Sequence, residues 1–312
     1  MANTILSLIV PVYNEEEVLR TSYERMRRVM ENTGLGYEMI FVNDGSRDGT
    51  MGILRAIAAE DTNVRVFSFS RNFGHQLAVT CGMDHAAGDA LIIIDADLQD
   101  PPELIPAMIE KWRGGADIVY GKRLKREGES FMKKFTAAVY YRLLDWMSAY
   151  PIPLDTGDFR LLDRKVADVF LRMREHDRYL RGMSAWMGFN AVPVEYRRDE
   201  RAAGKTKYTL KKMLKLAMDG ITGFSDKPLV LPGYLGIALS VIAVLGFIAL
   251  IIVRCAAGSL PAWLWAVAGL VLINGLTLCC MGLWGLYLGR MYTELKDRPL
   301  YLVCEELGVK RD

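Results

Sequence analysis

Residues 90–100, with the sequence ALIIIDADLQD, join an apolar run to a cluster of carboxylates. The apolar part, residues 90–94, has the length and composition of a buried strand. Similar runs occur elsewhere in the chain, at residues 5–12, 38–42, 64–69 and 118–120. Segments with the composition of helices lie between them, at residues 15–32, 49–60, 76–87 and 102–113. This alternation predicts an α/β fold in which helices cover both faces of a mostly parallel sheet.

Polar loops follow three of the predicted strands directly. Their sequences are PVYNE at residues 11–15, NDGS at residues 43–46 and DADLQD at residues 95–100. Ligands bind beyond the carboxyl ends of parallel strands, so we expect these loops to surround one crevice. Carboxylates gathered there repel one another unless a cation lies among them, and oxygen ligands favour Mg²⁺ or Mn²⁺. For the D-x-D sequence taken alone, a solvated turn is the alternative interpretation.

Charge and cysteine content exclude several classes of protein. The net charge of +2 at pH 7 is too small to indicate a nucleic-acid-binding protein. None of the five cysteines belongs to a C-x-x-C pair, which favours a reducing compartment without a structural zinc or disulfide framework. The first residues have no basic region and no small-residue cleavage site, so we expect no signal peptide.

Two apolar segments, residues 229–253 and 262–288, are long enough to cross a bilayer, which takes about 20 residues. Lysines and arginines lie before the first and after the second, whereas the loop between them contains only Arg254. The positive-inside rule therefore predicts that both ends face the cytoplasm. The alternative, two buried helices of a soluble core, requires a larger core than this chain can build.

Residues 209–224 place apolar side chains at helical spacing opposite lysines, which predicts a helix lying on the membrane surface. The alternative is a helix packed against the soluble domain. We therefore expect an α/β domain, a juxtamembrane helix with its linker, two transmembrane helices and a cytoplasmic tail. Their expected bounds are residues 1–208, 209–228, 229–253, 262–288 and 289–312.

Five motifs carry a resemblance to a known family. PVYNEE, NDGSRDGT and DADLQDPPE resemble the signature of family-two glycosyltransferases with the GT-A fold. TGDFRLLDR at residues 156–164 and RAAGKTKY at residues 201–208, followed by two apolar segments, are similar to polyisoprenyl-phosphate glycosyltransferases. That group includes dolichol-phosphate mannosyltransferases and bactoprenol glucosyltransferases. The resemblance covers nearly the whole chain, and its specificity lies in the combination and order of the motifs.

The resemblance implies roles for individual residues. The positions that match those holding the base and ribose of a nucleotide-sugar donor are Pro11, Tyr13, Glu15, Val42 and Asp44. The positions that match the D-x-D contacting ribose and diphosphate are Asp95, Ala96 and Asp97. Asp97 and Gln99 match metal ligands, so the resemblance implies Mg²⁺ or Mn²⁺ as cofactor.

Basic residues complete the site that the resemblance implies. Arg123 matches an arginine near the phosphates, and Arg201 and Lys207 match the basic pair of an R-x-x-G-x-S-K loop. This chain has Thr206 where that loop usually has serine, which keeps the hydroxyl. The acceptor is also an anion, and this basic loop precedes the expected juxtamembrane helix, where a lipid phosphate would arrive. Simple attraction to anionic lipids is the alternative role for these charges.

Asp158 matches a position proposed as the catalytic base in related inverting transferases. A phosphate monoester has a second pKa of about 6, so it is already largely a dianion at neutral pH. We therefore expect Asp158 to orient the acceptor or to take its last proton. A structural cap or an ion pair with Arg160 is the alternative. His75 follows the third predicted strand, where it could face the site, although a lone histidine is more often structural.

The resemblance implies transfer of glucose from UDP-glucose to a polyisoprenyl phosphate at the cytoplasmic membrane face, with inversion and by a homo-oligomer such as a tetramer. Other donors stay open: GDP-mannose, UDP-GlcNAc, UDP-galactose and a UDP-aminoarabinose type. A processive polysaccharide synthase is a second interpretation, but neither Gln76 nor Gln99 starts its Q-x-x-R-W motif. A non-catalytic membrane scaffold is the third, and the intact D-x-D argues against it.

Overall fold

The computed structural model describes residues 6–123, 156–196 and 262–308, together with the isolated helical positions 245, 248 and 252. These residues fall into two compact units. The first is an α/β unit that includes residues 6–123, 156–196 and 299–308. The second contains the long helix α10, Ala262–Leu295.

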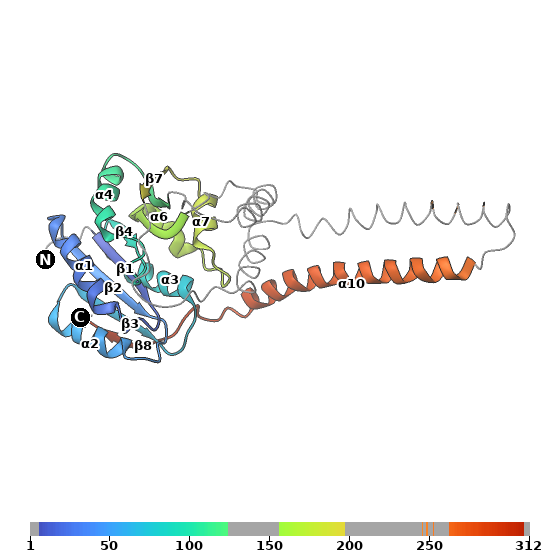
Figure 1. Ribbon diagram of the computed structural model, residues 1–312, viewed down its shortest axis with the longest axis horizontal. Helices are drawn as coiled ribbons and strands as arrows, with labels where there is room; N and C mark the ends of the chain where they lie inside the picture. Colours follow the sequence, from blue (N-terminus) through green and yellow to red (C-terminus); the bar gives the residue numbers. More distant parts are fainter. Residues whose placement is uncertain are drawn as a thin grey trace. The chain divides into compact units, whose positions relative to one another are not determined.

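One sheet of eight strands forms the centre of the α/β unit, in the order β7-β5-β6-β4-β1-β2-β3-β8 (Figure 1). The strands are β1 Leu6–Val12, β2 Tyr37–Asn43, β3 Val64–Phe69, β4 Ala90–Ile93, β5 Ile118–Arg123, β6 Thr156–Asp163, β7 Ala191–Tyr196 and β8 Val303–Leu307. Strand β1 pairs in parallel with β2 and β4, and β2 pairs in parallel with β3. The pairs β4–β6, β5–β6 and β3–β8 are antiparallel. The predicted mostly parallel α/β sheet is confirmed as a mixed, mostly parallel one.

Helices cover both faces of this sheet, as the sequence predicts. The helices of the α/β unit are α1 Leu19–Asn32, α2 Thr50–Glu60, α3 His75–His85, α4 Ile105–Arg113, α6 Arg164–Arg172 and α7 Leu180–Trp186. Successive residues of a strand point to opposite faces. Accordingly, Met39 and Phe41 of β2 belong to the cluster built with α1, α2 and α4. Ile40 and Val42 belong to the cluster built with α3.

Residues 303–307, expected to be part of a tail, form the edge strand β8. The backbone N–H of Ser70 donates to the carbonyl of Leu302 over 3.0 Å, and the Tyr301 hydroxyl donates to Asp84 over 2.5 Å. A bidentate pair, with distances of 2.9 and 2.8 Å, joins Arg55 to Glu305. Because the segment is short and carries two glutamates, its sequence gives no alternating strand pattern.

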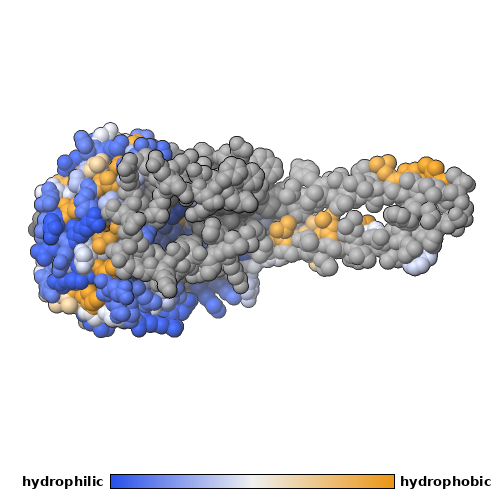
Figure 2. Space-filling view, in the orientation of Figure 1, coloured by the Kyte–Doolittle hydropathy of each residue, from blue (hydrophilic) through white to orange (hydrophobic). Residues whose placement is uncertain are grey.

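The expected membrane segments are only partly described. The juxtamembrane helix lies outside the described residues, as does the segment 229–253 apart from its three helical positions. The segment 262–288 lies within α10. No helix in the described ranges combines the length and the apolar character needed to cross a membrane. Figure 2 shows hydrophobic surface on the unit that contains α10. The exposed large hydrophobic side chains of this helix include Trp263, Leu270, Met281, Trp284 and Leu288.

Gly45, in the loop after β2, has a backbone conformation that the other amino acids rarely adopt, with φ at +66°. A Cβ atom there would lie 2.4 Å from the backbone carbon of Arg71. We expect Gly45→Ala to destabilise the fold by about 2 kcal/mol or more, because strained backbone and a backbone clash combine. The matched control is Gly52→Ala in α2, where a Cβ meets nothing within 4 Å. Thermal unfolding of both variants checks this, and equal midpoints would contradict it.

Candidate active site

The loop after β2 meets the loop after β3 through Asp44. Its carboxylate accepts hydrogen bonds from the backbone N–H of Phe73 over 2.7 Å and of Gly74 over 3.0 Å. The side-chain amide of Asn72 donates to it over 2.8 Å. Burial raises the pKa of Asp44, although these backbone donors favour its charged form. Asp44, the carboxylate expected to hold the nucleotide-sugar donor, is thus fixed by residues 72–74, which lead into α3.

The loop after β1 is tied to the loop after β2 by two further hydrogen bonds. The backbone N–H of Asn14 donates to Ser46 Oγ over 2.9 Å, and that of Glu15 donates to Thr50 Oγ1 over 3.0 Å. Tyr13 lies in the same loop with 37% of its surface exposed. The first two loops that the sequence singles out therefore adjoin each other, as the parallel pairing of β1 and β2 requires.

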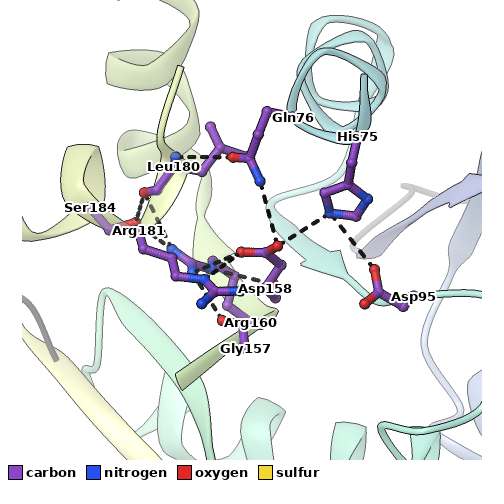
Figure 3. Close-up of polar contacts among 9 residues, drawn as sticks. All are labelled: His75, Gln76, Asp95, Gly157, Asp158, Arg160, Leu180, Arg181 and Ser184. Carbon is purple, nitrogen blue, oxygen red and sulfur yellow. Dashed lines mark hydrogen bonds and ion pairs between the residues drawn. The ribbon is translucent and has the colours of Figure 1, made fainter. Parts of the chain in front are cut away.

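Asp158 lies on β6, beside β4, and its carboxylate is surrounded by donors (Figure 3). Its Oδ1 is 2.8 Å from Arg181 Nε, and its Oδ2 is 3.3 Å from His75 Nε2 and 3.5 Å from Gln76 Nε2. Burial alone would raise its pKa, but the positive charge of Arg181 and the contact with His75 hold the pKa well below its usual range. Asp158 is therefore a carboxylate at neutral pH and a weak proton acceptor.

An ion pair with Arg160 is the alternative role expected for Asp158. Asp158 contacts two arginines, and its contact with Arg160 is the longer of the two. Arg160 Nη2 lies 3.8 Å from Asp158 Oδ1, whereas Arg181 lies at 2.8 Å. Arg160 is buried, and its Nη1 donates to Ser184 Oγ over 2.5 Å. Burial lowers its pKa to about 10, still far above neutrality. Arg181, which no sequence motif singles out, is the closer cation.

His75 lies between two carboxylates of the site (Figure 3). Its Nε2 is 3.3 Å from Asp158 Oδ2 and 3.8 Å from Asp95 Oδ1. Burial opposes a charge on the ring, but the contact with Asp158 and the negative charge of Asp95 outweigh it and raise the pKa of His75 to about 9. Of the two roles that the sequence left open for His75, facing the site and purely structural, this position favours the first. Its place after the third strand, at the ligand-binding edge, was the available signal.

The D-x-D loop after β4 is held by hydrogen bonds. The hydroxyl of Ser22 donates to the carbonyl of Ala96 over 2.5 Å, and the backbone N–H of Gln99 donates to Asp97 Oδ1 over 3.1 Å. The side chain of Gln99 is also buried. Burial raises the pKa of Asp95 to about 6, and the charges of neighbouring carboxylates, among them Asp158, add to this.

The side chains of the D-x-D loop fit a divalent cation. In the described ranges no cluster of three or more His, Cys, Asp or Glu could hold a metal ion. Magnesium needs no such cluster, since it uses one or two carboxylates and completes its shell with phosphate and water oxygens. Asp97 and Gln99 provide two side chains with oxygen donors, and the carboxylates crowded around Asp95 favour a positive charge nearby.

The structure leaves several predicted site residues undecided. Pro11 lies in β1, Val42 is buried in β2 and Arg123 ends β5, with a side chain outside the described set. Arg201 and Lys207 lie outside the described residues altogether. The structure brings together the predicted carboxylates Asp44, Asp95 and Asp158. Each of the three contacts a residue of the segment 72–76.

Comparisons with known proteins relate this chain to glycosyltransferases. The profile described as Glycosyl transferase family 2 matches residues 7–171. An uncharacterized glycosyltransferase of Bacillus subtilis (strain 168) is 52% identical over 305 residues, covering 97% of this chain and 94% of that protein. A bactoprenol glucosyl transferase of Shigella phage SfV is 39% identical over 302 residues, covering 96% and 98%.

Among solved structures, a mannosyltransferase from Pyrobaculum calidifontis in complex with GDP-Man and Mn2+ is 18% identical to this chain. The match covers 92% of this chain and 87% of that one, with a TM-score of 0.46. Both sequence relatives are matched over nearly their whole length.

Proposed function

Because this chain belongs to glycosyltransferase family 2, we propose that it moves glucose from UDP-glucose onto a polyisoprenyl phosphate. It is a glycosyltransferase, and several of its relatives are named bactoprenol glucosyl transferases. Those names support both the sugar and the class of lipid acceptor. The observation that carries the proposal is the convergence of Asp44, Asp95 and Asp158 on one edge of the sheet.

The donor would lie across the loops after β1, β2 and β4. As the sugar departs, the nucleoside diphosphate gains negative charge, which positive groups beside it stabilise. A divalent cation bound by Asp97 and Gln99 would supply such a charge next to the diphosphate. Arg123, which matches an arginine near the phosphates in the family, would add a second positive charge. Asp44, fixed by Phe73 and Gly74, would hold the nucleoside end.

The acceptor would attack as a phosphate dianion. With a second pKa of about 6, it needs little help to lose its proton. Asp158 suits a positioning role better than proton transfer, because its own pKa is held low by Arg181. Arg201 and Lys207 would bind the acceptor phosphate. A single displacement inverts the anomeric centre, so an α-linked donor gives a β-linked lipid phosphosugar, and no covalent enzyme intermediate forms.

The lipid acceptor requires that the enzyme work at a membrane. We infer that residues 229–253 and 262–288 anchor it there, with the α/β unit on the cytoplasmic side. Their apolar sequences and the exposed hydrophobic side chains of α10 support this. The expected homo-oligomer stays a prediction.

Transfer of label tests the proposal. Purified full-length protein is incubated with undecaprenyl phosphate, Mg²⁺ or Mn²⁺, and one labelled donor at a time: UDP-glucose, UDP-galactose, UDP-GlcNAc or GDP-mannose. We expect label in the organic phase with UDP-glucose, dependent on the lipid. Label from a different donor would replace the sugar but keep the reaction. Nucleotide binding with no label from any donor would overturn the proposal in favour of the scaffold interpretation.

A further inference from the structure

Residues 72–76, with the sequence NFGHQ, join the end of β3 to the start of α3 and touch three carboxylates of the site, those of Asp44, Asp95 and Asp158. The backbone of this segment binds Asp44, after β2. The side chain of His75 meets Asp95, after β4, and Asp158, on β6. One short connection therefore links three loops or strands that are far apart in the sequence.

Gln76 adds a second bridge from the same segment. Its Nε2 lies 3.5 Å from Asp158 Oδ2, and its Oε1 accepts a hydrogen bond from the backbone N–H of Leu180 over 3.1 Å. Leu180 starts α7, the helix that also carries Arg181. The amide of Gln76 thus holds Asp158 and the helix of its cationic partner in one arrangement (Figure 3).

His75 differs from Gln76 because it also contacts the donor side. Its Nε2 is buried and makes no aligned hydrogen bond with any described residue, yet it points between Asp95 and Asp158. Two carboxylates on either side of one ring repel each other. When the ring is protonated, it attracts both carboxylates and offsets that repulsion. The other charged groups that act on the ring are Arg181, which opposes its charge, and Asp44.

The opposite end of α3 provides a comparison within the same helix. His85 is its last residue, and its Nδ1 lies 2.8 Å from the carbonyl oxygen of Cys81. Its ring packs on Phe67, with the ring centroids 4.0 Å apart. His85 has the contacts of a structural histidine, whereas His75 has those of a group between functional carboxylates.

We propose that His75 is a positioning residue of the transfer site, which holds the Asp158 carboxylate in register with the donor loop at Asp95. This inference rests on the proposed function, because Asp95 and Asp158 are assigned there to the donor and acceptor sides. Loss of the contact lets the two sides move apart without removing either one.

Such a role predicts a specific kinetic pattern. A displacement of about 1 Å at a reacting centre costs up to about 100-fold in rate, so we expect His75→Ala to lower kcat by about 10- to 100-fold. The KM for the donor should change by less than about 3-fold, because the nucleoside contacts through Asp44 remain. His75→Gln retains an N–H donor near the position of Nε2 and should recover part of kcat.

The pH profile separates positioning by charge from a purely structural role. Wild-type kcat should fall as pH rises through about 9, the pKa of His75, because the ring then loses its charge. The Gln variant cannot titrate there, so its profile should lack that fall. A decline shared by both proteins belongs to the substrates. Identical profiles for wild type and His75→Gln would overturn the inference.

The control variant is His85→Gln, the same substitution at the other end of α3. It should leave kcat within about 3-fold of wild type, since its ring touches no substrate-side group. Equal losses in His75→Ala and His85→Gln would mean that both act through stability, which contradicts a positioning role for His75. Activity of His75→Ala within about 2-fold of wild type would contradict it directly.

A measurement without substrate keeps the two proposals apart. The chain has three histidines, so the imidazole NMR signal of His75 can be assigned by its loss in His75→Gln. We expect Asp158→Asn to shift that signal and to leave the signals of His85 and His176 in place. An unmoved His75 signal refutes the contact. Absence of lipid-linked label from wild-type enzyme refutes only the proposed function.

Discussion

Asp97→Ala is expected to lower kcat/KM for the nucleotide-sugar donor by at least about 1,000-fold. Asp97 is the carboxylate of the D-x-D loop that the family resemblance assigns to the metal. Its removal takes away both a ligand and the negative charge that draws a cation to the loop. The hydrogen bond from the backbone of Gln99 to Asp97 Oδ1 is also lost, which loosens the loop. Initial rates of label transfer at saturating lipid measure the effect.

Asp89→Ala is the matched control for this variant. Asp89 is exposed and directly precedes β4, whereas Asp97 lies beyond the other end of that strand. The same substitution there should leave transfer within about 2-fold of wild type, as at most surface positions. Binding of Mn²⁺ in the presence of UDP, followed by electron paramagnetic resonance, gives a readout independent of turnover. Retention of Mn²⁺ binding and of a tenth of the activity in Asp97→Ala would contradict the assignment.

Asp158→Asn is expected to lower kcat by about 100-fold at every pH. The substitution keeps the shape of the side chain but removes the charge that Arg181 and His75 contact. Without it, the positive charges of Arg181 and His75 lose this partner and the groups around the side chain move. Rates of label transfer between pH 5.5 and 9 at saturating substrates, values chosen to bracket the acceptor's second pKa of about 6, measure the effect.

The shape of that profile decides between the two roles expected for Asp158. Burial would raise its pKa, yet the charge of Arg181 keeps the pKa well below the usual range, so the wild-type profile should show no ionisation of Asp158 near neutrality. Its acidic limb should instead lie at a pH of about 6, where the acceptor phosphate ionises and where the pKa of Asp95 also lies. We expect the variant to have the same limb and a lower plateau. Convergence of the two curves at high pH would instead assign Asp158 the removal of the acceptor's last proton.

The central strands could be predicted because their signal is local. Strands β1 to β4 are buried apolar runs followed by polar loops, and these loops carry residues of the candidate site. Strand β6 carries Asp158 and Arg160 within an eight-residue strand, so its apolar pattern is interrupted. Strand β8 has two glutamates in five residues. Such strands are defined by pairing with distant partners, which periodicity cannot reveal.

The candidate site likewise combines residues that local sequence signals reveal with residues that only distant contacts bring in. The D-x-D loop and Asp44 follow recognisable strands, whereas Gln76 and Asp158 are 82 residues apart and Arg181 lies a further 23 residues along the chain. A histidine and a glutamine at the start of one helix and an arginine on another give no pattern in the sequence. Only the folded chain, in which side chains of α3 and α7 contact Asp158 of β6, shows that they share one carboxylate.

The most direct test of the central claim is the structure of the lipid product. Wild-type enzyme is given undecaprenyl phosphate and UDP-glucose labelled with ¹³C at the anomeric carbon, and the organic phase is analysed by mass spectrometry and NMR. We expect a lipid phosphate heavier by one hexose, with a β-configured anomeric carbon bonded to phosphate oxygen. Free glucose with unchanged lipid, or an α-linked product, would contradict it.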